Sequence, residues 1–163
     1  MFEKDKLKGG SVMQHYLSQQ VVYIRRTNQT RGQTEIAYYN GEIEWVDVSP
    51  DFLLNQTLKM VNSSLTASRK SVKESLKFAQ YTPVIIDASQ NLVFFPLHPK
   101  DSYEMCYINN QHYLQAVDHA ETMIYFTNGR SLTVKEKSAH VVKYYNRALQ
   151  AADFYSKMKK RFL

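Results

Sequence analysis

Four basic side chains lie close together near the middle of the sequence, at Arg69, Lys70, Lys73 and Lys77. Arg69, Lys73 and Lys77 follow one another at intervals of four positions, so in a helix they would stack along one side. A row of cations on a rigid support is the arrangement that binds a polyanion such as nucleic acid. A solvated helix face has the same composition, and spacing alone leaves that alternative open.

The residues around this row predict the elements that must hold it. Small or apolar side chains recur every three or four positions over residues 64–78, which predicts a helix with one buried stripe. The expected stripe consists of Leu65, Ser68, Val72, Leu76 and Ala79. Residues 83–96 are apolar on both sides of a turn at residues 89–91, which predicts a buried hairpin that anchors the basic helix.

The rest of the chain favours an α+β fold, with a mostly antiparallel sheet built from hairpins, two central helices and a long C-terminal helix. Asn40–Gly41 and Asn128–Gly129 are strong signals for two-residue hairpin turns, and Asn109–Asn110 predicts a third tight hairpin. Ser49 is expected to cap the first helix, which would begin at Pro50 and bury Phe52, Leu53, Leu54, Leu58 and Val61. Residues 135–162 predict the last helix, with an apolar stripe through Val141, Val142, Tyr145, Ala148, Leu149, Ala152, Tyr155 and Met158.

Composition sets the limits on the class of protein. The chain has 163 residues, 44% of them hydrophobic, which is enough for one domain with a real core. We expect residues 1–10 to form a mobile tail and residues 11–163 to form a single domain. The net charge of +6 favours an anionic partner. A single cysteine excludes an intrachain disulfide and fits a cytoplasmic location, and no apolar run approaches the length of a membrane span.

Catalytic chemistry finds little support in the sequence. The five histidines show no metal-ligand spacing, so we expect no metal site and no cofactor. Cys106 lies in an apolar strand and is expected to be a small buried hydrophobe rather than a nucleophile. A metal-dependent nuclease built from Asp87, Glu136 and Lys137 is a weaker hypothesis, since Asp87 is better placed to accept hydrogen bonds from the turn at Ser89. We therefore predict that the protein is not an enzyme.

Two further groups of basic residues are candidates for phosphate contact. Arg130, beside the Asn128–Gly129 turn, could enter a minor groove or could be an ordinary exposed turn residue, and Lys100 is a weaker candidate. The chain ends in Lys157, Lys159, Lys160 and Arg161, which either bind phosphate or only complement the negative end of the helix dipole. The long stripe of the last helix could also dock on a second subunit or another protein. A non-catalytic protein-interaction module is therefore the alternative function.

An ordered set of short motifs from Ser63 to Tyr155 resembles the competence transcription factor (ComK) family of Gram-positive bacteria. The set consists of Arg69–Lys70, Pro83, Ile86–Asn91, Phe94–Pro96, Cys106 and Phe126–Arg130. The chain departs from the family pattern at Ser68, where a glycine is usual, and at Tyr107, one position before the place of the family's tryptophan.

The resemblance implies a transcriptional activator of DNA-uptake genes that binds A/T-rich boxes through the minor groove and bends them as more than one subunit. Arg69, Lys70, Lys73, Lys77, Arg130 and Lys100 are then the expected DNA-binding residues. The expected partners are double-stranded A/T-rich DNA and further copies of this chain, in the cytoplasm at the nucleoid, without a membrane. RNA polymerase and a proteolytic adaptor are further candidate partners, although the tail that the adaptor reads in some members does not follow Leu163 here.

Overall fold

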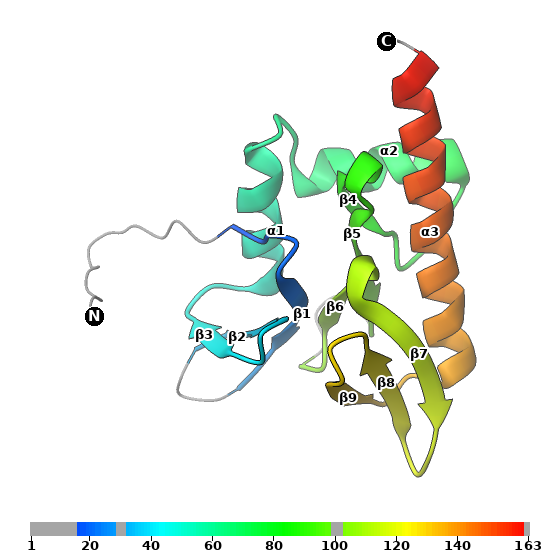
Figure 1. Ribbon diagram of the computed structural model, residues 1–163. Helices are drawn as coiled ribbons and strands as arrows, with labels where there is room; N and C mark the ends of the chain where they lie inside the picture. Colours follow the sequence, from blue (N-terminus) through cyan, green and yellow to red (C-terminus); the bar gives the residue numbers. More distant parts are fainter. Residues whose placement is uncertain (1–15, 29–31, 99–102, 162–163) are drawn as a thin grey trace.

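The computed structural model describes residues 16–28, 32–98 and 103–161 (Figure 1). The strands are β1 (Val21–Arg26), β2 (Thr34–Tyr38), β3 (Ile43–Val46), β4 (Val84–Asp87), β5 (Leu92–Leu97), β6 (Cys106–Asn109), β7 (Tyr113–Asp118), β8 (Thr122–Phe126) and β9 (Ser131–Val134). The helices are α1 (Pro50–Lys59), α2 (Leu65–Leu76) and α3 (Ser138–Arg161), with short 3₁₀ turns η1 (Ala88–Gln90) and η2 (Asn110–His112).

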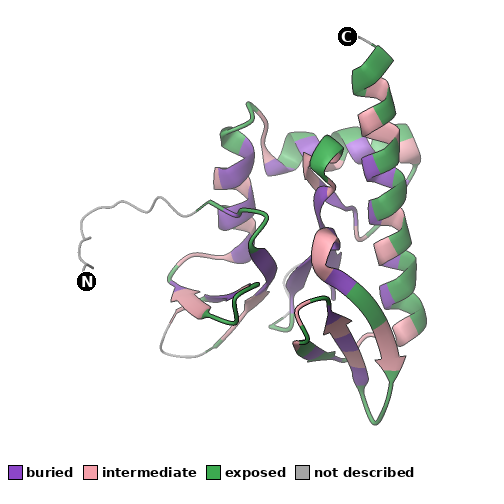
Figure 2. Ribbon diagram, viewed as in Figure 1, coloured by how far each residue is buried: buried purple, intermediate pink, exposed green. Residues whose placement is uncertain are grey.

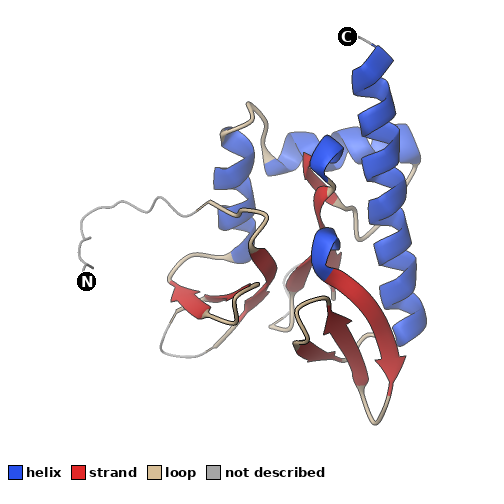
Figure 3. Ribbon diagram, in the orientation of Figure 1, coloured by secondary structure: helices blue, strands red, loops and turns tan. Residues whose placement is uncertain are grey.

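The predicted α+β class is confirmed, and the strands divide between two antiparallel sheets. A six-stranded sheet has the order β3-β2-β1-β6-β5-β4, and a three-stranded sheet has the order β7-β8-β9. Figure 3 shows how the helices border these sheets, with the long α3 running beside the smaller one. The hairpins predicted at Asn40–Gly41, at residues 83–96 and at Asn128–Gly129 all form.

Strand β5 holds the core together because both of its faces are buried (Figure 2). Val93, Phe95 and Leu97 point toward α3 and the smaller sheet. Leu92 and Phe94 point the other way, toward the apolar side chains of α1 and the first turn of α2. Alternate side chains of a strand face opposite sides of its sheet, so a strand between two layers is apolar throughout. The predicted buried hairpin is therefore the centre of a layered domain.

Helix α1 begins as predicted, because the Ser49 hydroxyl accepts a hydrogen bond from the Phe52 N–H at 3.1 Å and Pro50 takes the first helical position. The helix ends at Lys59, and its buried apolar face is shorter than expected. Phe52 and Val61 are 44% and 49% exposed, so their assignment to that face was wrong. Phe52 lies on the solvent side of the first turn, and Val61 lies beyond the helix end.

The predicted hairpin at Asn109–Asn110 was also wrong. Strand β6 pairs with β1 and β5, whereas β7 pairs with β8 in the other sheet. The Asn109 side chain accepts a hydrogen bond from the Gln111 N–H at 3.0 Å and donates one to the Val21 carbonyl at 2.7 Å. Asn109 thereby starts the short turn η2, which carries the chain from one sheet to the other instead of folding it back.

Helix α3 buries a narrower stripe than the sequence suggests. Val141, Tyr144, Ala148, Ala151 and Ala152 are buried against the core. Val142 and Leu149 are 40% and 38% exposed, so these two residues do not widen the buried stripe as expected. The small side chains of the alanines let the helix lie close to β5 and β7, and they leave Val142 and Leu149 on its outer side.

Candidate nucleic-acid interface

The basic helix α2 is shorter than predicted and changes direction at its end. The Ser64 hydroxyl caps it by accepting from the Ala67 N–H at 3.1 Å, and Leu65, Ser68 and Val72 are buried. The helix ends at Leu76, and Lys77 takes a left-handed conformation with φ of 61°. Ala79, expected in the stripe, is exposed. Lys77 thus follows the helix rather than extending the predicted row of cations.

Three lysines of this segment lie open to solvent. Lys70, Lys73 and Lys77 are exposed, and within the described ranges none of them forms an ion pair. Glu74 is the one acidic residue of α2. Unpaired cations on a helix anchored by buried Leu65 and Val72 keep their full charge for an external anion. The expectation of an outward-facing basic group is therefore met by these three residues.

Arg69 is placed differently from the lysines. Its Nη2 donates to the Tyr107 hydroxyl at 2.6 Å, and that hydroxyl donates to Asp51 Oδ1 at 2.6 Å. The same Arg69 nitrogen lies 3.5 Å from Asp51, and the Arg69 side chain is only 23% exposed. Burial, with the nearby Asp51 carboxylate, keeps the pKa of Tyr107 far above its ordinary value. Arg69 therefore joins α2 to α1 and β6, and its charge is partly neutralised within the molecule.

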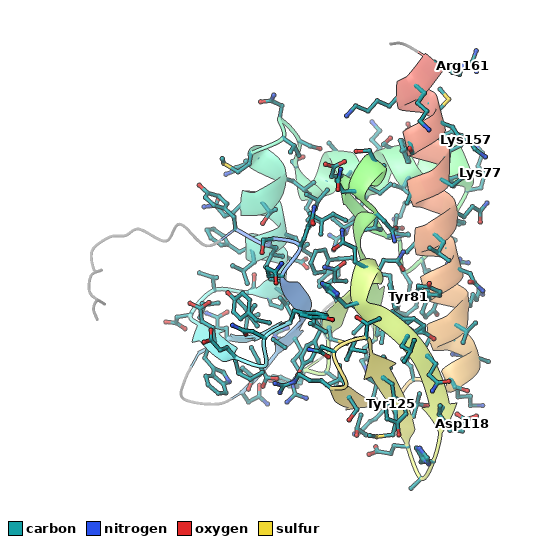
Figure 4. All side chains as sticks on the ribbon, viewed as in Figure 1. Lys77, Tyr81, Asp118, Tyr125, Lys157 and Arg161 are labelled. Carbon is teal, nitrogen blue, oxygen red and sulfur yellow. The ribbon has the colours of Figure 1, made fainter. Side chains whose placement is uncertain are left out.

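A second basic group, for which the sequence left phosphate binding open, lies close to the first. The Ser71 and Tyr155 hydroxyl oxygens lie 2.7 Å apart, which brings the C-terminal half of α3 against α2. The last turns of α3 expose Lys157, Lys159, Lys160 and Arg161. Figure 4 shows Lys77, Lys157 and Arg161 in the same upper part of the molecule, although Lys157 also pairs with Asp153 at 2.9 Å. The sequence showed the basic end but could not place it beside α2.

Arg130 lies in a different region, where two hairpin turns meet. Its Nη1 donates to the Gly41 carbonyl at 2.5 Å, and Asn128 Nδ2 donates to the Tyr39 carbonyl at 3.0 Å. The Asn40–Gly41 and Asn128–Gly129 turns therefore dock on each other and link the two sheets. Arg130 is half-buried, and within the described part of the chain its other guanidinium N–H groups have no hydrogen-bond partner. Lys100 lies outside the described residues.

The residues of the nuclease hypothesis do not come together. Asp87 lines a hollow with Tyr155 and Lys159 near the end of α3, where it accepts hydrogen bonds from Ser89 as predicted. Glu136 precedes the start of α3 and pairs with His98 at 3.4 Å. Asp87 lies beside Tyr155 and Lys159, near one end of α3, whereas Glu136 lies just before the other end. At 1.5 Å per helical residue, the length of α3 between these positions puts the two carboxylates on the order of 30 Å apart. Asp87 and Glu136 cannot share a metal ion, so the site proposed for a nuclease was wrong.

The other groups considered for catalysis have structural roles. Cys106 is buried at 2% exposure, as expected, and burial raises the pKa of its thiol to about 12. A thiol with that pKa stays protonated and is a poor nucleophile at neutral pH. Among the residues that the structure describes, no cluster of histidine, cysteine or acidic side chains could hold a metal ion. Over the same part of the chain, no helix has the length and apolar character needed to cross a bilayer.

A two-sided core carries open lysines on one helix, next to the basic end of another. These features define an α+β domain whose exposed cations suit a polyanionic surface. The family model described as "ComK protein" matches residues 13–162, so the chain belongs to the ComK family. ComK proteins are competence transcription factors, and the family assignment implies DNA binding. No curated protein and no solved structure matches the chain.

Proposed function

We propose that this protein activates competence genes by binding A/T-rich duplex DNA, with phosphates contacted by the basic surface of α2 and α3. We define this surface as Lys70, Lys73, Lys77, Lys157, Lys159, Lys160 and Arg161. The observation that carries the proposal is the contact between Ser71 and Tyr155, because it joins two groups of exposed cations from distant parts of the chain. Each neutralised phosphate releases condensed counterions, so binding through this surface would weaken steeply with salt.

Base selection requires a different element from the helices. An α-helix with side chains is about 10 Å wide, whereas the minor groove is about 6 Å wide, so α2 and α3 can contact only the backbone of an A/T-rich site. A narrow A/T minor groove has a strongly negative potential and attracts arginine. Arg130, held at the junction of the two hairpin turns, is the candidate for that contact. Bending the duplex would let the helices and Arg130 reach it together.

The experiment compares A/T-rich and G/C-rich duplexes of equal length across a salt series by fluorescence anisotropy. The wild-type protein should bind the A/T-rich duplex more tightly, with log K falling linearly as log salt rises. Lys73→Glu with Lys77→Glu should abolish binding without changing the melting temperature appreciably. The control, Lys137→Glu with Lys143→Glu, changes the net charge by the same amount at exposed positions away from the basic surface. This control should bind DNA much more tightly than the Lys73→Glu and Lys77→Glu double variant. If the wild-type protein bound neither duplex at low salt, the proposal would be refuted.

Self-association on DNA is part of the same proposal, and it accounts for the exposed apolar residues of α3. Val142 and Leu149 are 40% and 38% exposed and lie seven positions apart, which places them on one side of the helix. The same pair supports the alternative function, a protein-interaction module that acts without DNA. The double variant Val142→Gln with Leu149→Gln distinguishes the activator from the interaction module. If the variant loses cooperative DNA binding, the activator is supported. If the wild-type protein binds no DNA and the variant loses a protein partner, the interaction module is supported.

A further inference from the structure

A pocket of about 480 Å³ lies between α2, the loop that follows α2, and the end of β5. Its volume is in the range of sites that bind small molecules. Tyr81, labelled in Figure 4, belongs to this loop, and its ring stacks on Tyr144 of α3 with centroids 4.6 Å apart. The lining residues are Arg69, Lys73, Ala79, Gln80, Tyr81, Thr82, Pro96, His98 and Met105.

The pocket exists because the β4–β5 ladder stops early. Val84 pairs with Phe94, so a continued register would bring Thr82 opposite Pro96. Proline has no N–H to donate across a ladder, and β4 begins only at Val84. Thr82 is nevertheless buried at 5% exposure, and its hydroxyl has no hydrogen-bond partner within the described part of the chain. A buried hydroxyl without a partner costs free energy, which a ligand that bonds to it would recover.

The charges around the pocket come mainly from α2. Lys73 lines the pocket and forms no ion pair with any described residue. Arg69 also lines it, with its Nη2 held by the Tyr107 hydroxyl and Asp51. On the opposite side His98 is 7% exposed and is paired with Glu136. Asp51 pairs with Arg69 and Glu136 pairs with His98, so both acids reduce the net charge around the pocket. Lys73 is therefore the cation that an entering anion would neutralise.

The loop also offers backbone donors. Gln80 and Tyr81 both line the pocket, and no carbonyl among the described residues accepts a hydrogen bond from either N–H. Arg147 of α3 donates to the Gln80 carbonyl at 2.9 Å, which holds the loop in place. Tyr81 has a φ of 54°. Successive N–H groups in a loop with a left-handed residue are a frequent way to surround an anion.

We infer that this pocket binds the phosphate group of a small phosphorylated compound. Lys73, Arg69, the Thr82 hydroxyl and the free loop amides supply donors for the phosphate oxygens. Pro96, Met105 and the Tyr81 ring supply apolar contact for the remainder of the ligand. The inference does not depend on DNA binding, although Lys73 belongs to both surfaces and a bound phosphate would compete with DNA for it.

The test uses the full chain without DNA and titrates inorganic phosphate, pyrophosphate and adenosine 5′-monophosphate by calorimetry, at constant ionic strength set with chloride. Saturable binding of at least one probe is expected. Lys73→Gln should weaken it about tenfold and Thr82→Val about fivefold, the effects of a lost charged and a lost neutral hydrogen bond. Lys70→Gln, on the same helix but outside the pocket, should change it little.

Three results would overturn the inference: no saturable binding, equal weakening by Lys70→Gln and Lys73→Gln, or unchanged binding in a folded Thr82→Val protein. The melting temperature of each variant shows whether it is folded. Duplex binding is measured separately on the same variants. If Thr82→Val weakened duplex binding but not phosphate binding, the pocket would serve DNA and this inference would be refuted. If the wild-type protein bound no duplex at all, only the proposed function would be refuted.

Discussion

The hydroxyl oxygens of Ser71 and Tyr155 lie 2.7 Å apart, although 84 residues separate them in the chain. The contact holds the C-terminal half of α3 against α2, and it brings the open lysines of one helix beside the basic end of the other. Neither group alone is unusual for an exposed helix. The proximity of the two groups follows from tertiary structure alone.

The basic end of α3 should contribute directly to DNA affinity. Lys159→Ala with Lys160→Ala is expected to weaken binding at moderate salt and to lower the slope of log K against log salt by about 1 for each lost phosphate contact. Fluorescence anisotropy at several salt concentrations measures both quantities. Lys143→Ala, in the N-terminal half of α3, is the control and should leave the slope unchanged. An unchanged slope in the double variant would mean that these lysines only complement the helix dipole.

Arg69 should matter for stability more than for binding. Arg69→Met keeps much of the apolar stem but removes the hydrogen bond to Tyr107 and the ion pair with Asp51. We expect the free energy of unfolding to fall by about 2 kcal/mol, because Asp51 and the Tyr107 hydroxyl lose a charged partner. Lys70→Met should change it by less than about 0.5 kcal/mol. Urea denaturation measures both free energies of unfolding, and the opposite ranking would contradict the role of Arg69 as a structural anchor.

A variant of Arg130 tests separately whether this residue stabilises the fold and whether it selects A/T-rich DNA. Arg130→Ala removes the hydrogen bond to the Gly41 carbonyl, so the free energy of unfolding should fall by about 1 kcal/mol. If Arg130 also enters the minor groove, the ratio of A/T-rich to G/C-rich affinity should fall as well. Anisotropy on the two duplexes, measured well below the melting temperature, tests this point. A loss of stability with an unchanged affinity ratio would leave Arg130 with only its role between the sheets.

Alkaline pH should destabilise the protein. Burial raises the pKa of Cys106 to about 12, and burial also raises the pKa values of Tyr23, Tyr38 and Tyr107. The unfolded chain loses these protons near the ordinary values of about 8.5 for cysteine and 10 for tyrosine, while the folded chain keeps them. Stability is therefore fully present below about pH 8 and is lost as the pH rises from there toward 12.

Urea midpoints measured between pH 7 and pH 10.5 test this expectation. Cys106→Ala should flatten the decline, because it removes one of the protons that only the folded state retains. Thiol labelling gives an independent check, since the native protein at pH 9 should react far more slowly than the urea-unfolded chain. Rapid labelling of the folded protein at pH 9 would contradict the protected, protonated state of Cys106.

The sequence by itself determined the local features. The Ser49 cap, the Asn–Gly hairpins and the apolar run of β5 depend on neighbouring residues, and each forms as predicted. The ends of the helices could not be predicted as well, because the left-handed turn at Lys77 and the end of α1 at Lys59 depend on where the chain must go next. The division into two sheets depended on Asn109, whose side chain bonds to Val21, 88 residues away.

Only the tertiary structure decided which cations are free. Arg69 and Lys73 are one helical turn apart in an apparently uniform row, yet Arg69 meets Asp51 and Tyr107 while Lys73 meets no acid among the described residues. Those partners come from α1 and β6, and no periodicity within α2 encodes their positions. The same is true of α3, whose basic end lies beside α2 because the buried alanines of α3 pack against the core. Long-range packing therefore decides which cations are available to a partner, since charge becomes available only where the fold leaves it unpaired.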